Sequence, residues 1–146
     1  MPGAMRDRLA VVIIVLALVG LGLSVDSLIN HYKKSPTEFC DINDTFNCDV
    51  VNRSSYSKLY GIPVAAIGIA GYIVLALLAL KDRANRTAST LLVILSLGAL
   101  GFSAYLTYIE ARVLYTYCIV CLSSAVCIVL ITILAIVRHV KKPTAA

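Results

Sequence analysis

Four long apolar runs separated by short charged pieces constrain this 146-residue sequence more than any other feature. Each run has about 20 residues, the length that a helix needs to cross a hydrocarbon core of about 30 Å. Since open strands cannot face lipid and the runs do not alternate polar with apolar residues, helices are the expected spanning structure. The prediction is an all-α integral membrane four-helix bundle, with residues 1–146 as a single domain. The spans are Leu9–Ile29, Gly61–Leu80, Leu91–Ile109 and Cys118–Val137.

The composition agrees with a membrane protein and excludes other classes. Of the residues, 60% are hydrophobic and 14% are charged, against about 25% charged in a typical soluble domain. The basic residues lie at the ends of the apolar runs, so no nucleic-acid partner is expected. A cleaved signal peptide is the competing interpretation of the first run, because Arg6 and Arg8 precede it. That run is long for a signal core, and no Ala-x-Ala pattern follows it.

Lysine and arginine are distributed unevenly between the two sets of run ends. The side with both termini and the connection after Leu80 carries eight basic and two acidic residues, a net charge of +6. The other side carries five basic and six acidic residues, a net charge of −1. The positive-inside rule predicts cytoplasmic termini, with residues 30–60 and 110–117 on the outer face. The expected location is a multi-pass cell membrane, either a prokaryotic inner membrane or, in a eukaryote, that of the endoplasmic reticulum.

The end of the long outer loop has an intermediate character. Asp49–Tyr60 is too polar to span a membrane, yet it carries several valine, leucine and tyrosine residues. A short interfacial helix lying over the mouth of the bundle would fit this pattern. The alternative is an irregular connector.

Four of the five cysteines form two pairs on the same predicted face. Cys40 and Cys48 lie in the long outer loop, while Cys118 and Cys121 lie at the outer start of the fourth run. That face is the oxidising side, where disulfides form and persist. Residues three apart on a helix rise about 4.5 Å, which is within reach of a disulfide. The start of a helix also favours the reactive thiolate, so Cys118 and Cys121 are placed where a bond can open and close.

Other interpretations of the cysteines remain open. Both pairs could be static disulfides, or all four could form a zinc site, although no histidine lies nearby in the sequence. A bridge between Cys118 and Cys121 closes almost no loop and so adds little stability, which favours a bond that is meant to be broken. Cys127 lies about 9 Å deeper along the helix and is expected to be packing filler.

Small and aromatic residues add two weaker signals. Gly61, Ala65 and Gly68 follow helical spacing, which is typical of close helix packing in lipid and, as an alternative, of a slot for a flat ligand. Tyrosines gather around the end of the third run, where an interfacial aromatic belt is expected. As an alternative, one or two of them line a pocket that opens toward Cys121. They are Tyr105, Tyr108, Tyr115 and Tyr117.

Taken together, these motifs resemble the vitamin K epoxide reductase family over Leu9–Val137. The resemblance combines a spaced cysteine pair in a long loop, a serine six residues after it, a particular start of the second run, and a Cys-x-x-Cys that opens the last run. Other quinone-linked disulfide generators of bacterial membranes have the two cysteine pairs in the reverse order. The motifs are Cys40, Cys48, Ser54, Tyr60-Gly61-Ile62-Pro63-Val64 and Cys118-Ile119-Val120-Cys121.

The resemblance implies a bundle around a quinone of the menaquinone, ubiquinone or vitamin K type. Cys118 and Cys121 would be the catalytic pair, with Cys121 facing the quinone. Cys40 and Cys48 would shuttle electrons, with Cys48 attacking Cys118. Many prokaryotic members carry a fused thioredoxin-like domain, whereas this sequence stops after the fourth run, so a separate thioredoxin-fold partner is implied.

The resemblance also suggests candidate quinone contacts and two departures. By analogy Ser54 helps to fix the short helix over the pocket, and Tyr60 and Tyr117 are further candidate contacts. Ala125 occupies the position at which the vertebrate enzymes have a tyrosine. Their asparagine near the start of the second span has no counterpart in Ser57–Ile62. Both missing residues are associated with hydrogen bonds to the quinone.

The favoured hypothesis is a membrane thiol:quinone oxidoreductase that supports disulfide formation. It would pass electrons from the partner's thiols through the two cysteine pairs to a membrane quinone. Reduction of vitamin K quinone or its epoxide is the alternative within the same class. A small transporter or structural membrane protein with static disulfides is the alternative from another class, but Asp26 is the only charge predicted inside a span.

Overall fold

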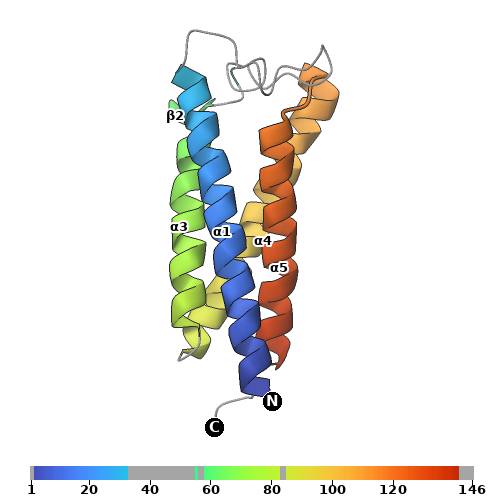
Figure 1. The fold of residues 1–146 in the computed structure, drawn as a ribbon. Helices are drawn as coiled ribbons and strands as arrows, with labels where there is room; N and C mark the ends of the chain where they lie inside the picture. Colours follow the sequence, from blue (N-terminus) through green and yellow to red (C-terminus); the bar gives the residue numbers. More distant parts are fainter. Residues whose placement is uncertain (1, 33–54, 56–57, 83–84, 142–146) are drawn as a thin grey trace.

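The computed structural model describes residues 2–32, 55, 58–82 and 85–141, which form four long helices and one short hairpin (Figure 1). The predicted all-α four-helix bundle is confirmed. The elements are α1 (Pro2–Tyr32), β1 (Lys58–Leu59), β2 (Ile62–Pro63), α3 (Val64–Lys81), α4 (Arg86–Ile109), the π-helix η2 (Glu110–Leu114) and α5 (Ile119–Lys141).

The four helices have the length and the surface of membrane spans. Each is long and apolar enough to cross a bilayer. Large apolar side chains such as Val11, Leu18, Leu77, Ile94 and Ile133 are exposed on the outside of the bundle. Such a surface is unfavourable in water but is matched by lipid, so the protein is a multi-pass membrane protein.

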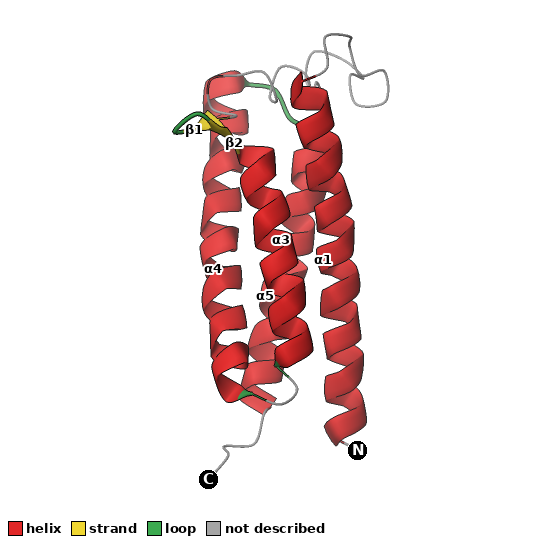
Figure 2. Cartoon of the chain, turned by 90° about the vertical axis from the view of Figure 1, so that its left-hand side faces the viewer, coloured by secondary structure: helices red, strands yellow, loops and turns green. Residues whose placement is uncertain are grey.

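Neighbouring helices run in opposite directions around the bundle. Each long helix packs against two others. The first helix, α1, packs against α3 and α5, and α4 closes the ring by packing against the same two helices. Figures 1 and 2 show that α1 begins and α5 ends at the same end of the bundle. We call this the terminal end, and we call the opposite end, where α5 begins beside Cys118, the cysteine end. The side of the membrane that each end faces stays a prediction.

An apolar core fills the middle of the bundle and the half toward the terminal end. Its fully buried members include Ile13 of α1, Ala79 of α3, Leu92 of α4 and Ile131 of α5. Each long helix therefore contributes to one continuous core.

A buried ion pair joins two of these helices at the terminal end. Asp82, at the end of α3, binds the guanidinium of Arg138 in α5, and both side chains are almost fully buried. Beside this pair, the Ser89 hydroxyl hydrogen-bonds the His139 ring across 3.0 Å. The charge pattern predicted Asp82 and Arg138 at the membrane surface on the side of the termini, and in the structure their ion pair also ties α3 to α5.

The start of the second span differs from the prediction. Gly61–Pro63 was expected to begin the helix, but β1 and β2 form an antiparallel hairpin with Tyr60 and Gly61 at its turn. Both turn residues have positive φ, 53° and 83°, as a two-residue turn of type I′ requires. Pro63 then precedes α3 as its N-cap residue instead of lying in the first turn.

The other predicted boundaries need smaller corrections. The helices α1, α4 and α5 extend beyond the apolar runs, because polar residues continue a helix once it leaves the hydrocarbon. The predicted interfacial helix Asp49–Tyr60 is wrong at its last three residues, which form β1 and the turn. Apart from Ser55, the rest of that segment lies outside the described residues.

Candidate functional site

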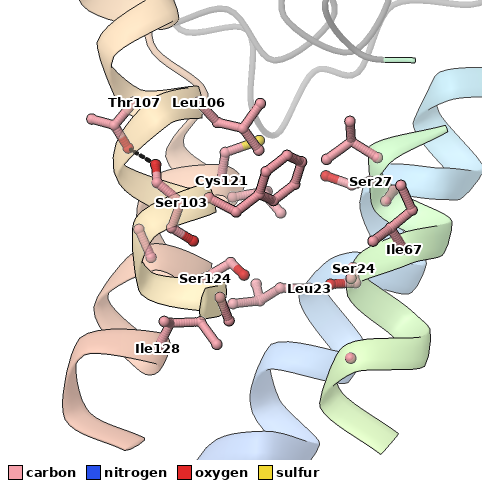
Figure 3. Close-up of a pocket in the computed structure, with 18 of the residues that line it drawn as sticks. Leu23, Ser24, Ser27, Ile67, Ser103, Leu106, Thr107, Cys121, Ser124 and Ile128 are labelled. Carbon is pink, nitrogen blue, oxygen red and sulfur yellow. Dashed lines mark hydrogen bonds between the residues drawn. The ribbon is translucent and has the colours of Figure 1, made fainter. Parts of the chain in front are cut away.

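A cavity of about 360 Å³ opens at the cysteine end between all four long helices. Most of its lining is apolar, and Leu75 and Ile128, which belong to the core, line its deep part. Polar side chains from several helices converge on the space (Figure 3). They include Ser24 and Ser27 of α1, Ser103 and Thr107 of α4, and Cys121 and Ser124 of α5.

The two neighbouring cysteines occupy different positions relative to this cavity. Cys118 directly precedes α5, is completely buried, and accepts a hydrogen bond at its Sγ from the Cys121 amide across 3.3 Å. Its sulfur thus takes the place of an N-cap oxygen, where the sequence had predicted the first helical residue. Cys121 lies one turn on and lines the cavity.

Glu110 holds the turn that leads into the cysteines. It is 3% exposed, and its carboxylate accepts a hydrogen bond from the Cys118 amide, with 3.1 Å between the nitrogen and Oε2. Its backbone carbonyl accepts the amides of Tyr115 and Thr116, where the chain turns through a left-handed residue, Tyr115. Glu110 also lines the cavity, so one residue fixes the approach of the Cys-x-x-Cys segment and presents a carboxyl group to the same space.

A second polar contact crosses the bundle deeper in the cavity. The Tyr72 hydroxyl of α3 lies 2.6 Å from Ser124 Oγ and 2.9 Å from the Ser124 carbonyl oxygen. The Tyr72 ring packs on Gly20 of α1, where any side chain would overlap it. Gly68 similarly leaves room for Ser24. Gly68 therefore serves close packing, as predicted, and it also lines the cavity, whereas no group lies within 4 Å of a carbon added at Gly61 in the hairpin turn.

The comparison with known families agrees with this arrangement. Residues 11–136 match the model of the vitamin K epoxide reductase family. The chain belongs to that family. Membership supports a membrane oxidoreductase that works between thiols and quinones.

A family quinone fits the cavity by size and lining. Cavities that bind small molecules measure about 300 to 1,000 Å³ and are mostly apolar with a few converging polar groups. Gly71 of α3 and Gly98 of α4 line the cavity, and no group lies within 4 Å of a carbon added at either position. Ser27 and Cys121 both line the cavity, and their side chains lie close enough to interact. The pocket therefore offers an apolar slot with a thiol at its side.

Only some of the predicted site residues among the described ones line this cavity. Cys121 and Ala125 line it. Tyr60 is 97% exposed at the hairpin turn and Tyr117 is half-buried, and neither lines the cavity, so their contact with a quinone stays a prediction. Tyr105, Tyr108 and Tyr115 are exposed, which agrees with an aromatic belt. Cys40, Cys48 and Ser54 lie outside the described residues.

Sequence analysis missed Glu110, Tyr72 and Ser124. Glu110 was assigned to an outer loop because the apolar run ends at Ile109, whereas the helix continues as η2. A carboxylate eight residues before the Cys-x-x-Cys was a signal for it, but Tyr72 looked like an ordinary apolar residue of a span. Among the described residues, no group of three metal-ligating side chains occurs. The zinc alternative depends on Cys40 and Cys48, and so stays untested.

Proposed function

We propose that this protein is a thiol:quinone oxidoreductase in which Cys118 and Cys121 reduce a membrane quinone. The observation that carries the proposal is the position of Cys121, which lines an apolar cavity between the four helices. Cys118 lies one turn before it and outside the lining. One sulfur therefore faces a molecule in the cavity, while the other, which is buried outside the lining, would take part in the exchange with an incoming thiol.

The residues around the cavity would hold the ring of the quinone. The Ser124 hydroxyl, held by Tyr72, is a candidate partner for a quinone carbonyl, one residue before Ala125. This contact would replace the hydrogen bond of the tyrosine that the vertebrate enzymes have at the position of Ala125. When bound, the quinone supplies the acceptor for two electrons and two protons.

The electrons would reach Cys118 by thiol exchange from Cys40 and Cys48. The Cys48 thiolate attacks Cys118 in the Cys118–Cys121 disulfide, and Cys121 leaves as a thiolate. Cys40 then attacks Cys48, which forms the Cys40–Cys48 disulfide and releases Cys118. A separate thioredoxin-fold protein would reduce Cys40 and Cys48 again and would leave with the disulfide. Each exchange breaks one S–S bond and forms another.

The proposal is tested with purified protein in detergent, a small reduced dithiol and a soluble menaquinone or ubiquinone analogue. We expect the wild-type protein to reduce the quinone, measured by its absorbance, and Cys121→Ala to fall to the rate without protein. Cys127→Ala is the matched control, since Cys127 lies in the same helix but is not part of the cavity lining, and it should retain activity. Quinone reduction by the Cys121→Ala variant would contradict the proposal.

The same assay separates the two cysteine pairs. With a reduced thioredoxin-fold donor in place of the small dithiol, Cys40→Ala and Cys48→Ala should lose activity, because the donor then has to pass its electrons through this pair. If both variants keep full activity with the protein donor, the relay is wrong, although reduction by Cys118 and Cys121 would still stand.

The family match favours an oxidoreductase over a transporter or a structural membrane protein. Reduction of an epoxide stays a prediction, and it is tested by supplying vitamin K epoxide in the same assay.

A further inference from the structure

Glu110 is a buried carboxyl group that the proposed electron path does not use. It is 3% exposed near the end of a membrane-spanning helix. Ionisable residues inside a membrane are costly and generally mark function. A role in holding the Cys118 amide would need only a hydrogen-bond acceptor, which a neutral side chain also supplies. The presence of an acid at this position therefore indicates a role in the reaction in addition to holding the Cys118 amide.

The surroundings of Glu110 point to proton transfer with Cys121. Both residues line the same cavity, and they are close enough to interact electrostatically. In the part of the chain that the structure describes, no lysine or arginine lines this cavity, so no fixed positive charge from these side chains faces the carboxylate there. Oxidation of two thiols releases two protons, and an apolar cavity holds few groups that can accept one.

We propose that Glu110 accepts the proton of the Cys121 thiol and passes it into the cavity. As the Cys118–Cys121 bond forms, the two thiols lose two electrons and two protons. Glu110 carries one of these protons at a carboxyl oxygen and returns to the carboxylate, while the second proton leaves from Cys118. The proposal rests on the proposed function for the acceptor, a quinone that takes up both electrons and both protons.

Other titratable groups face Glu110 and have to be considered in any pH profile. Within the described ranges, α1 contributes His31 and α3 contributes Tyr72 to the cavity lining. Cys118 binds the carboxylate through its amide, and Arg112 lies on η2 itself but is exposed. The test therefore compares the reactivity of the Cys121 thiol with the turnover of the same variant.

Glu110→Gln is the informative variant because it keeps an oxygen that can accept the hydrogen bond from the Cys118 amide. Full-length protein in detergent is reduced, freed of reductant and treated with iodoacetamide between pH 5 and pH 9 without any quinone. Mass spectrometry then gives the alkylation rate of each cysteine peptide. Cys127 is the internal reference, since it lies away from the cavity lining in the same helix.

We expect the alkylation of Cys121 at pH 7 to be unchanged or faster in Glu110→Gln, because removing a neighbouring negative charge favours the thiolate, which is the reacting species. The rate at Cys127 should not change. In the assay with dithiol and quinone, turnover should fall by about 100-fold, a typical contribution of a general acid or base.

Turnover of Glu110→Gln equal to that of the wild type would overturn the proposal. A carboxylate that only repels negative charge would make Cys121 more reactive and turnover faster when it is removed, so the two roles differ in the sign of the change in turnover. A fall in turnover matched by an equal fall in Cys121 alkylation would also overturn the proposal, because the loss would then lie in access to the thiol. Should Glu110→Gln fail to fold, Glu110→Asp keeps the acid one methylene shorter, and its turnover should lie below that of the wild type. A turnover equal to the wild type would contradict the proposal. A wild-type protein that fails to reduce the quinone would instead remove the proposed function, so the two failures are distinguishable.

Discussion

The two ends of the bundle solve the same packing problem in different ways. At the terminal end the helices are joined by apolar side chains from all four helices and by the buried Asp82–Arg138 pair. At the cysteine end the same helices present serines, glycines and a glutamate to a cavity of about 360 Å³. The contrast indicates that one end provides stability so that the other can keep open space for a ligand.

The physical reason lies in the membrane as a solvent. Lipid tails are as apolar as the helix surfaces, so helices associate through close packing and polar contacts instead of through burial from water. The terminal end uses both kinds of contact. At the cysteine end, the Tyr72–Ser124 contact crosses the bundle, while the smaller side chains leave volume unfilled.

The largest effect on stability is expected from breaking the ion pair at the terminal end. Asp82→Ala should lower the free energy of unfolding by about 3–5 kcal/mol, because it leaves a buried guanidinium without its carboxylate partner. The double variant Asp82→Leu with Arg138→Met should recover most of this loss. Unfolding in mixed detergent micelles measures both. A single variant as stable as wild type would remove the contrast between the ends.

A smaller effect is expected where the packed half meets the cavity. Gly20→Ala places a methyl group on the Tyr72 ring and should cost about 1–3 kcal/mol, as overpacking does. Gly22→Ala is the matched control, because no other group lies within 4 Å of the added carbon. The same unfolding measurement compares them. Equal stability of the two variants would show that Tyr72 is not held against α1.

The smallest effect concerns the polar contact inside the cavity. Ser124→Ala should raise the KM for the quinone about fivefold, since one neutral hydrogen bond contributes about 1 kcal/mol. Ser123→Ala, the exposed neighbour, should leave KM unchanged. Steady-state kinetics with the dithiol donor measures both variants. A KM of Ser124→Ala equal to that of the wild type would show that the quinone carbonyl does not bind Ser124. The remaining candidate hydroxyl groups would then be those of Ser24, Ser27 and Ser103.

Much of the bundle could be predicted because length and hydropathy act locally. All four spans are present, and their order places Cys118 and Cys121 where the last one begins. The start of α3 could not be predicted, because Tyr60 has no intrinsic preference for the positive φ that its hairpin imposes. Glu110 was missed for a similar reason, since the apolar run ends before it although the helix does not.

The sequence by itself determined that four helices cross a membrane and that a Cys-x-x-Cys opens the last one, because these features depend on neighbours along the chain. Only the tertiary structure decided which sulfur lines the cavity, which carboxyl lies beside it and which hydroxyl crosses the bundle. Those contacts join residues from different helices, and the separation of such residues follows from how side chains interlock and not from their spacing in the chain.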